Sequence, residues 1–259
     1  MLLPIQRCRE QNTMNKFIVL LLVCGLSTGV LAKDFAQHKQ ERLINKCLNP
    51  QVNKQISLKN SISSILTIYP EQVDVVLKVA LNEYPSMYQD IMIGAKQAHP
   101  VLACDVIQIV LDANVAPPSE IVSIAVAAEP AYAQEIVSIA ALNSPADIEN
   151  IVRVAISTEP VMSQAVVSNA ANSFPDQVIS ILIGAIKAVP EKVSSLVKET
   201  IALFPTDSEA IVTHAINSSD EKHASKIVKS AIQAGLDEQS AINAAIAGGA
   251  NAEKLAKNN

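Results

Sequence analysis

The sequence predicts an all-α protein, a right-handed α-solenoid of short antiparallel helices, and three observations lead to it. A proline recurs every fifteen residues, a fixed order of aliphatic and small residues follows each proline, and acidic residues gather just after the prolines. Self-similarity at a fixed period is typical of stacked structural units. Val115 replaces the proline once, and we interpret this as a local substitution because the aliphatic pattern keeps its phase there. The prolines of the series are Pro70, Pro85, Pro100, Pro130, Pro145, Pro160, Pro175, Pro190 and Pro205.

The residues between successive prolines form one apolar stripe. Counting the proline as position zero, positions three, six, seven and eleven are mostly aliphatic, and position ten is mostly alanine. In the unit that begins at Pro175 these residues are Val178, Ile181, Leu182, Ile186 and Ala185. Spacings of three and four residues place them all on one face of a helix. Each period therefore predicts one helix of about 12 residues.

The prolines predict where these helices begin and end. Proline fits the first turn of a helix, and it keeps the residue before it out of the helical conformation. A helix of about 12 residues is only about 18 Å long and is marginal by itself in water, so its stability must come from stacking. Short connections make successive helices antiparallel, and the natural repeat is then a hairpin of about thirty residues.

The pattern divides the chain into four predicted segments. Residues 55–249 form the repeat domain, residues 33–54 an irregular amino-terminal cap, and residues 250–259 a polar tail. Residues 1–32 have the basic, apolar and small-residue regions of a secretory signal peptide, with Met14 as the true start and cleavage after Ala32. An uncleaved anchor and a lipoprotein processed at Cys24 are the alternatives, but the apolar run is short for a membrane span and Val23 is bulky for lipoprotein processing. We expect an exported protein, periplasmic or secreted.

The net charge restricts the classes of partner that the protein can bind, and the cysteines bear on whether it contains a disulfide. Without residues 1–32 the chain has 17 basic and 24 acidic residues, a formal charge of −7, which argues against nucleic acid and anionic membranes as partners. Cleavage leaves two cysteines, Cys47 and Cys104. In an oxidising compartment two remaining cysteines favour a disulfide, and two buried free thiols are the alternative reading.

Motifs of catalysis, cofactor binding and metal binding are absent from the sequence. It contains no GxGxxG, GxxxxGK[ST], GxSxG or HExxH segment. Carboxylate pairs such as Asp147 with Glu149, or Asp207 with Glu209, resemble acid and base pairs, but helix starts explain their periodic placement. The histidines are scattered without metal-ligand spacing, so we expect surface or helix-end positions for them. They are His38, His99, His214 and His223. We therefore predict no enzyme, no cofactor and no metal site.

Aromatic residues recur immediately before prolines, at Tyr69, Tyr84, Phe174 and Phe204. The structural reading makes them plugs between helices at one edge of the stack, and the functional reading makes them a binding ridge. A residue series at repeat spacing usually serves packing, so the plug reading is favoured.

The helix-hairpin period and the small residues at helix contacts resemble the two-helix solenoid class that includes tetratricopeptide arrays. The resemblance covers most of the chain, but tetratricopeptide units are longer and have Trp, Gly and Tyr at set places, whereas this chain has no Trp and seven Gly. The resemblance therefore implies a stack of helix hairpins, and it identifies no binding residues in this chain.

Three functions fit this architecture. The first is a non-enzymatic scaffold that binds a protein or an extended peptide along the array. The second is a structural component that self-associates through its ends, and the third is an amphiphile-binding or membrane-associated protein. The scaffold is the prediction that the sequence favours, because the carboxy-terminal stretch is polar and the apolar residues follow mainly one stripe.

Overall fold

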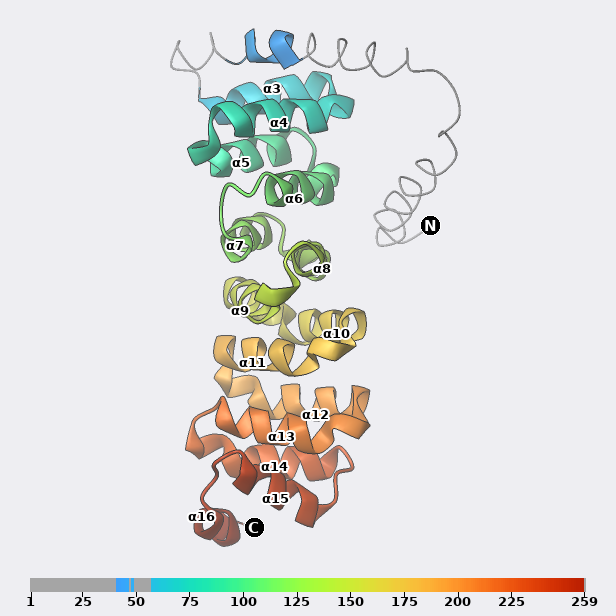
Figure 1. The fold of residues 1–259 in the computed structure, drawn as a ribbon, viewed down its shortest axis with the longest axis vertical. Coiled ribbons are helices and arrows are strands. Elements are labelled where there is room, and N and C mark those ends of the chain that lie inside the picture. The colour runs from blue at the N-terminus through green and yellow to red at the C-terminus, as the bar shows by residue number, and fades with distance from the viewer. Residues whose placement is uncertain (1–40, 47, 49–56, 259) are drawn as a thin grey trace, which may run out of the picture. The chain divides into compact units, whose positions relative to one another are not determined.

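The computed structural model describes residues 41–46, 48 and 57–258, and every regular element in these residues is a helix (Figure 1). The predicted all-α, solenoid-like repeat is confirmed. The chain divides into two compact units, Met1–Val115 and Ala116–Asn259. The boundary falls where the proline series misses a member, which the unbroken aliphatic pattern did not predict. The predicted signal peptide lies outside the described residues.

Each unit repeats an α-helix and a short 3-10 turn. In the first unit the α-helices are α3 Leu58–Ile68, α4 Val73–Glu83, α5 Tyr88–Ala98 and α6 Ala103–Asp112, with 3-10 turns η1 Pro70–Gln72, η2 Pro85–Met87 and η3 Pro100–Leu102 between them. In the second unit the α-helices are α7 Pro118–Ala128, α8 Ala133–Asn143, α9 Ile148–Thr158, α10 Ser163–Ser173, α11 Val178–Ala188, α12 Val193–Leu203, α13 Ser208–Asn217, α14 Ala224–Gln233, α15 Glu238–Ala247 and α16 Ala252–Asn258. Its 3-10 turns are η4 Pro130–Tyr132, η5 Pro145–Asp147, η6 Pro160–Met162, η7 Pro175–Gln177, η8 Pro190–Lys192, η9 Pro205–Asp207 and η10 Glu221–His223.

The residue before each proline makes the junction between two helices. Phe174 has φ −133° and ψ 65°, outside the helical region, as the following proline requires. Its N–H still donates to the Ala170 carbonyl at 2.8 Å, and its own carbonyl accepts from Gln177 N–H at 3.0 Å. The proline then begins a 3-10 turn, and the α-helix begins three residues later than the sequence predicted. Pro118 is the exception, since it begins α7 directly.

Helices two apart in the sequence pack directly on each other and run parallel. At the start of α12, Lys192 Nζ donates to the Pro160 carbonyl at 2.6 Å and to Ser163 Oγ at 3.0 Å, at the start of α10. Near the middle of the same helices, Ser168 Oγ donates to Glu199 Oε1. Because starts meet starts and middles meet middles, both helices run in one direction and α11 returns the chain between them. The thirty-residue hairpin is confirmed.

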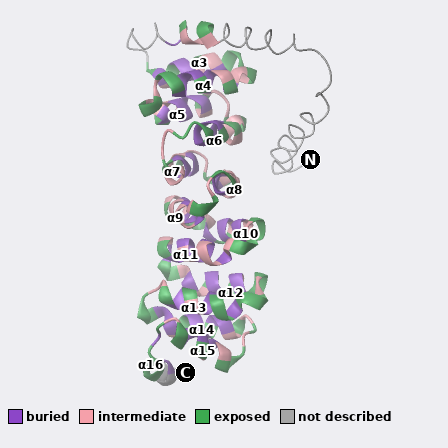
Figure 2. Cartoon of the chain, in the orientation of Figure 1, coloured by how far each residue is buried: buried purple, intermediate pink, exposed green. Residues whose placement is uncertain are grey.

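The helices of each unit therefore form two layers with the core between them. In the second unit, the odd layer comprises α7, α9, α11, α13 and α15, and the even layer comprises α8, α10, α12 and α14; Figure 1 shows α7, α9 and α11 on one side and α8 and α10 on the other. Figure 2 shows the buried residues on the inner faces of these helices. The predicted stripe is buried as expected: Ile181, Leu182 and Ala185 are fully inaccessible to solvent.

Position nine of the repeat sets how closely helices of one layer approach. A Cβ atom added to Gly184 in α11 would lie 2.3 Å from the Glu149 carbonyl oxygen in α9, so the two backbones touch there. Gly94 in α5 meets the Lys59 carbonyl of α3 at 2.5 Å in the same way. In the even layer, Asn169 occupies this position in α10, and its Nδ2 donates to Ser138 Oγ of α8 at 2.9 Å. Glycine at position nine thus gives backbone contact in α5 and α11, whereas α10 has a hydrogen-bonded side chain there.

Both ends of the described chain contain helix that the sequence did not predict. The predicted polar tail contains α16, because Asn251 Oδ1 accepts from Glu253 N–H at 2.9 Å and caps the helix start. Leu255 is buried at 4 % exposure and gives this short helix an apolar contact with the body of the unit. Residues 41–46 are also helical, within the segment predicted as an irregular cap.

We expect Gly184→Ala to lower the free energy of unfolding by about 1–3 kcal/mol, since the new methyl group overlaps the α9 backbone and the helices must move apart. Urea unfolding followed by circular dichroism measures this. Ser180→Ala, at a half-exposed position of the same helix, is the control and should change stability by about 0.5 kcal/mol or less. In an unconstrained helix, alanine would instead stabilise by about 1 kcal/mol, so a more stable Gly184→Ala variant would contradict the backbone contact.

Candidate functional site

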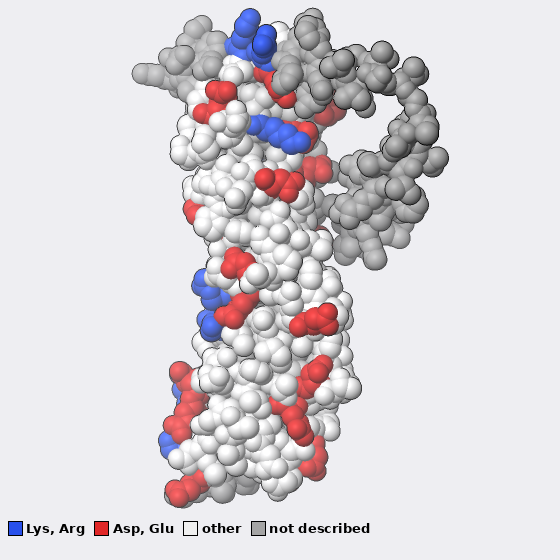
Figure 3. Space-filling model, viewed as in Figure 1, with Lys and Arg blue, Asp and Glu red and all other residues white. Residues whose placement is uncertain are grey.

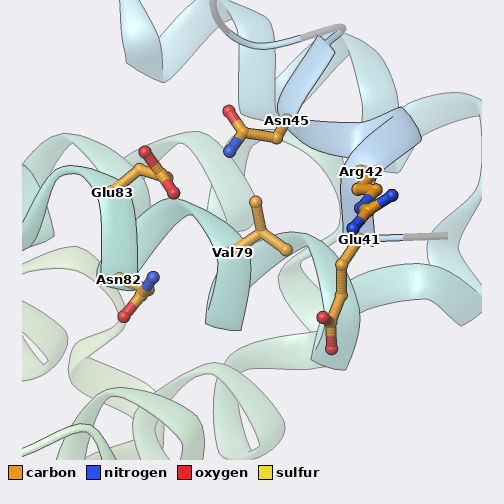
Figure 4. Close-up of a pocket in the computed structure, with 6 residues that line it drawn as sticks. All are labelled: Glu41, Arg42, Asn45, Val79, Asn82 and Glu83. Atoms are coloured by element: carbon orange, nitrogen blue, oxygen red, sulfur yellow. The ribbon is translucent and has the colours of Figure 1, made fainter. Parts of the chain in front are cut away.

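One surface depression of about 200 Å³ lies in the first unit, beside α4. Its lining is polar except for Val79, and Figure 4 shows Asn82 and Glu83 on one side of that valine and Glu41 and Arg42 on the other. The polar groups therefore do not converge on one point where a reacting atom would sit. Among residues 41–46, 48 and 57–258, no group of His, Cys, Asp or Glu side chains is arranged to hold a metal ion.

The histidines that the sequence singled out lie in three different environments. His99 is half-buried before η3, and its Nε2 is a buried atom without a hydrogen-bond partner. His214 is exposed on α13, whereas His223 is buried at 9 % exposure where α14 begins. His38 lies outside the described residues. The carboxylates of the predicted acid pairs serve packing at least in part, since Glu149 Oε1 pairs with Lys187 Nζ at 2.7 Å, joining α9 to α11.

Of the two cysteines in the predicted disulfide, one lies among the described residues. Cys104 is half-buried in the first turn of α6, and Cys47 lies outside the described residues, so the pairing stays a prediction. The next residue, Asp105, is exposed, yet the protein around its carboxyl removes part of the solvation and so raises its pKa above the usual 3.8.

The four aromatic residues before prolines do not share one edge. Tyr69 and Tyr84 end α3 and α4, which are consecutive helices and so have their ends at opposite edges of the first unit. Phe174 and Phe204 end α10 and α12, which run parallel in the even layer of the second unit, and therefore lie at the same edge. Tyr69 is 54 % exposed, and the other three are half-buried. Their backbones make the helix junctions, which leaves the identity of the side chain unconstrained by that role.

The structure adds exposed leucines to the edge that holds the two phenylalanines. Leu203 precedes Phe204 and is 39 % exposed, and Leu142 at the end of α8 is 66 % exposed. The sequence analysis did not single out either leucine, because both lie outside the predicted buried stripe. A leucine outside that stripe is the signal that could have identified them as exposed. We call this surface the phenylalanine edge: Leu142, Phe174, Leu203 and Phe204, with Asp147, Asp176 and Asp207 on the adjoining 3-10 turns η5, η7 and η9.

The charge of the phenylalanine edge has one sign. Residues 141–147, 171–177 and 201–207, which end α8, α10 and α12 and form the following turns, contain aspartate but no Lys or Arg. At the opposite edge, Glu129 and Glu159 directly precede η4 and η6, and η8 has Glu191 beside Lys192. In Figure 3, acidic side chains over the second unit form separate patches on a largely uncharged surface, so the charge is spread along the array.

No known protein family, no curated protein and no solved structure matches this chain. In the described part of the chain, no helix has the length and apolar character needed to span a membrane.

We expect Asp105→Asn to raise the free energy of unfolding at about pH 7 relative to Asp90→Asn. A raised pKa in the folded state means that stability is gained on protonation and lost as the pH rises through that pKa, and asparagine removes this loss. Both aspartates are the third residue of their helices, so the control has the same change in helix-dipole interaction. Urea titrations at about pH 4 and about pH 7 test this, and equal stability of the two variants at the higher pH would contradict it.

Proposed function

We propose that the protein is an exported, non-enzymatic scaffold that binds another protein or an extended peptide. The observation that carries the proposal is the phenylalanine edge, where apolar side chains that the fold does not fully bury recur along parallel helices. Repeat arrays present long continuous surfaces, and exposed apolar residues that recur on such a surface are typical of contact with a partner.

The structural alternative, self-association through the ends of the array, is weakened by the carboxy-terminal end. Helix α16 covers part of α14, with Leu255 buried and Glu253 and Lys254 exposed, as in a polar capping unit. Lys254 Nζ also pairs with Glu221 at 2.8 Å, an exposed ion pair that joins α16 to η10. The amphiphile-binding alternative would be favoured by exposed apolar residues on a second helix face. Ile124 of α7 lies outside the predicted apolar stripe, but it is half-buried rather than exposed, so this alternative has less support.

Export and the Cys47–Cys104 disulfide are parts of the same proposal. If the chain is cleaved after Ala32 and oxidised, the two cysteines close a long loop, and the chain-entropy estimate for such a loop is about 4 kcal/mol of stabilisation. Exported protein that is unfolded and treated with a maleimide should then show no free thiol. Reduction should lower stability in the parent and leave a Cys104→Ser variant unchanged; two labelled cysteines in exported protein would contradict the pairing.

The scaffold proposal is tested by affinity capture with the mature protein, from Lys33 onward, in the extracytoplasmic fractions of its source. We expect a stoichiometric partner that is lost, about tenfold or more, when Phe174 and Phe204 are changed to alanine, because truncated aromatic anchors commonly cost at least 1–2 kcal/mol of binding. Val161→Ala is the matched control, since Val161 is 82 % exposed at the opposite edge of the same unit. Capture that survives the double substitution, or is lost equally in the control, would contradict this surface as the binding site.

A further inference from the structure

We infer that residues 113–117, which connect α6 to α7, form a hinge about which the two compact units of the chain turn. The inference goes beyond the proposed function and does not depend on the identity of a partner. Three observations carry it: the hydrogen bonds of this junction, the conformation of Asn114, and the place of the boundary between the units.

Every junction that contains a proline of the series ties two helical segments together through the residue before the proline. At Phe174, the N–H donates to the Ala170 carbonyl in α10 at 2.8 Å, and the carbonyl accepts from the N–H of Gln177 in η7 at 3.0 Å. Rotation of the backbone at such a junction would break at least one of these bonds, so the junction is stiff. The same pair of bonds recurs at Tyr69, Tyr84, His99, Glu129, Ser144, Glu159, Val189 and Phe204.

The junction between α6 and α7 lacks this tie, and the sequence explains why. Asn114 precedes the position of the missing proline, and the third residue after it is Pro117, which has no N–H to donate to the Asn114 carbonyl. The two residues between them, Val115 and Ala116, make no backbone hydrogen bond. In the junctions after α13, α14 and α15, which also lack a proline, the last residue bonded to one helix directly precedes the first residue bonded to the next. Rotation about Val115 and Ala116 therefore breaks no backbone hydrogen bond.

The helices on both sides of the hinge are complete without it. Asn114 has φ 51° and is the one non-glycine residue with a positive φ among the described residues; a left-handed residue just past the last turn is a common helix end. Its N–H donates to the Leu111 carbonyl of α6 at 3.0 Å. Helix α7 begins at Pro118, and its first bonds run to the Pro117 carbonyl from the N–H groups of residues 120 and 121. Neither helix end depends on the conformation of the residues between them.

The division of the chain into compact units falls at the same two residues. The first unit ends at Val115 and the second begins at Ala116. Residues 112–114 and Pro117, on either side of this pair, are exposed to solvent. Domains joined by an exposed linker ordinarily move relative to each other, and a few linker residues absorb the change in φ and ψ. Val115 and Ala116 are the residues that can do so here.

Double electron–electron resonance on the full mature protein, with its native cysteines changed to serine, measures this motion. One pair of spin labels, at Gln97→Cys on α5 and Ala202→Cys on α12, spans the hinge. The control pair, at Ala127→Cys on α7 and Gln233→Cys on α14, spans the same number of helices within the second unit, and all four positions are exposed. We expect the distance distribution of the first pair to be at least about twofold broader than that of the control pair. Equal widths would overturn the inference.

A variant that rebuilds a regular junction tests the cause of the motion. Val115→Pro restores the proline of the series, and Pro117→Gln restores the N–H donor that Gln72 and Gln177 provide elsewhere. Pro118→Ala removes a ring that would oppose the turn conformation of the residue before it. In this triple variant we expect the hinge-spanning distribution to narrow to the width of the control pair, whereas Val115→Ala alone should leave it broad.

Circular dichroism checks that the triple variant keeps the helix content of the parent. A folded triple variant whose hinge-spanning distribution stays as broad as that of the parent would overturn the inference. If the variant fails to fold, the comparison of the two label pairs in the parent decides it.

Discussion

The steric conflict between a proline ring and the residue before it sets the architecture of this protein. A residue such as Phe174 is forced out of the helical region, so no α-helix in the regular array exceeds eleven residues. A helix of that length spans only about 16 Å and is marginal in water by itself. Its stability must come from neighbours two places away in the sequence, which is where α10 meets α12. The proline period therefore dictates both the length of the helices and their mutual dependence.

Within that frame, position nine decides how closely α11 approaches α9. Position nine faces the preceding parallel helix, and glycine there allows the α11 backbone to touch α9 at Glu149. The even layer has Asn169 at the same position and fills the space with a side-chain hydrogen bond to Ser138. Glycine in the interior of a helix costs about 1 kcal/mol of propensity relative to alanine. Its presence at Gly184 is explained by a contact that no other residue permits.

The sequence predicts what repeats and misses what occurs once. Ile181, Leu182 and Ala185 were predicted to be buried, and they are, because helical periodicity repeats over many units. The 3-10 turn after Pro175 was missed because a 3-10 turn and the start of an α-helix have nearly the same sequence preferences. Helix α16 depends on a single cap, Asn251, and a single buried residue, Leu255, which no period reveals. That Phe174 and Phe204 share an edge follows from the direction of their helices. That Leu142 and Leu203 belong to the same surface is seen only from their exposure in the structure.

The repeat architecture also indicates which positions of the chain are available for binding. Positions six, seven and ten are fixed by packing, since any large change there disturbs two neighbouring helices. The residue before the proline makes its junction through backbone atoms alone, so Ser144 and Phe174 do so equally well at successive turns of the even layer. The junction does not dictate the side chain at that position, which is buried at Val189 and exposed at Tyr69. The two residues after the proline include Asp as well as Val. Residues that the architecture does not dictate are available for binding, and at the phenylalanine edge they are apolar and acidic.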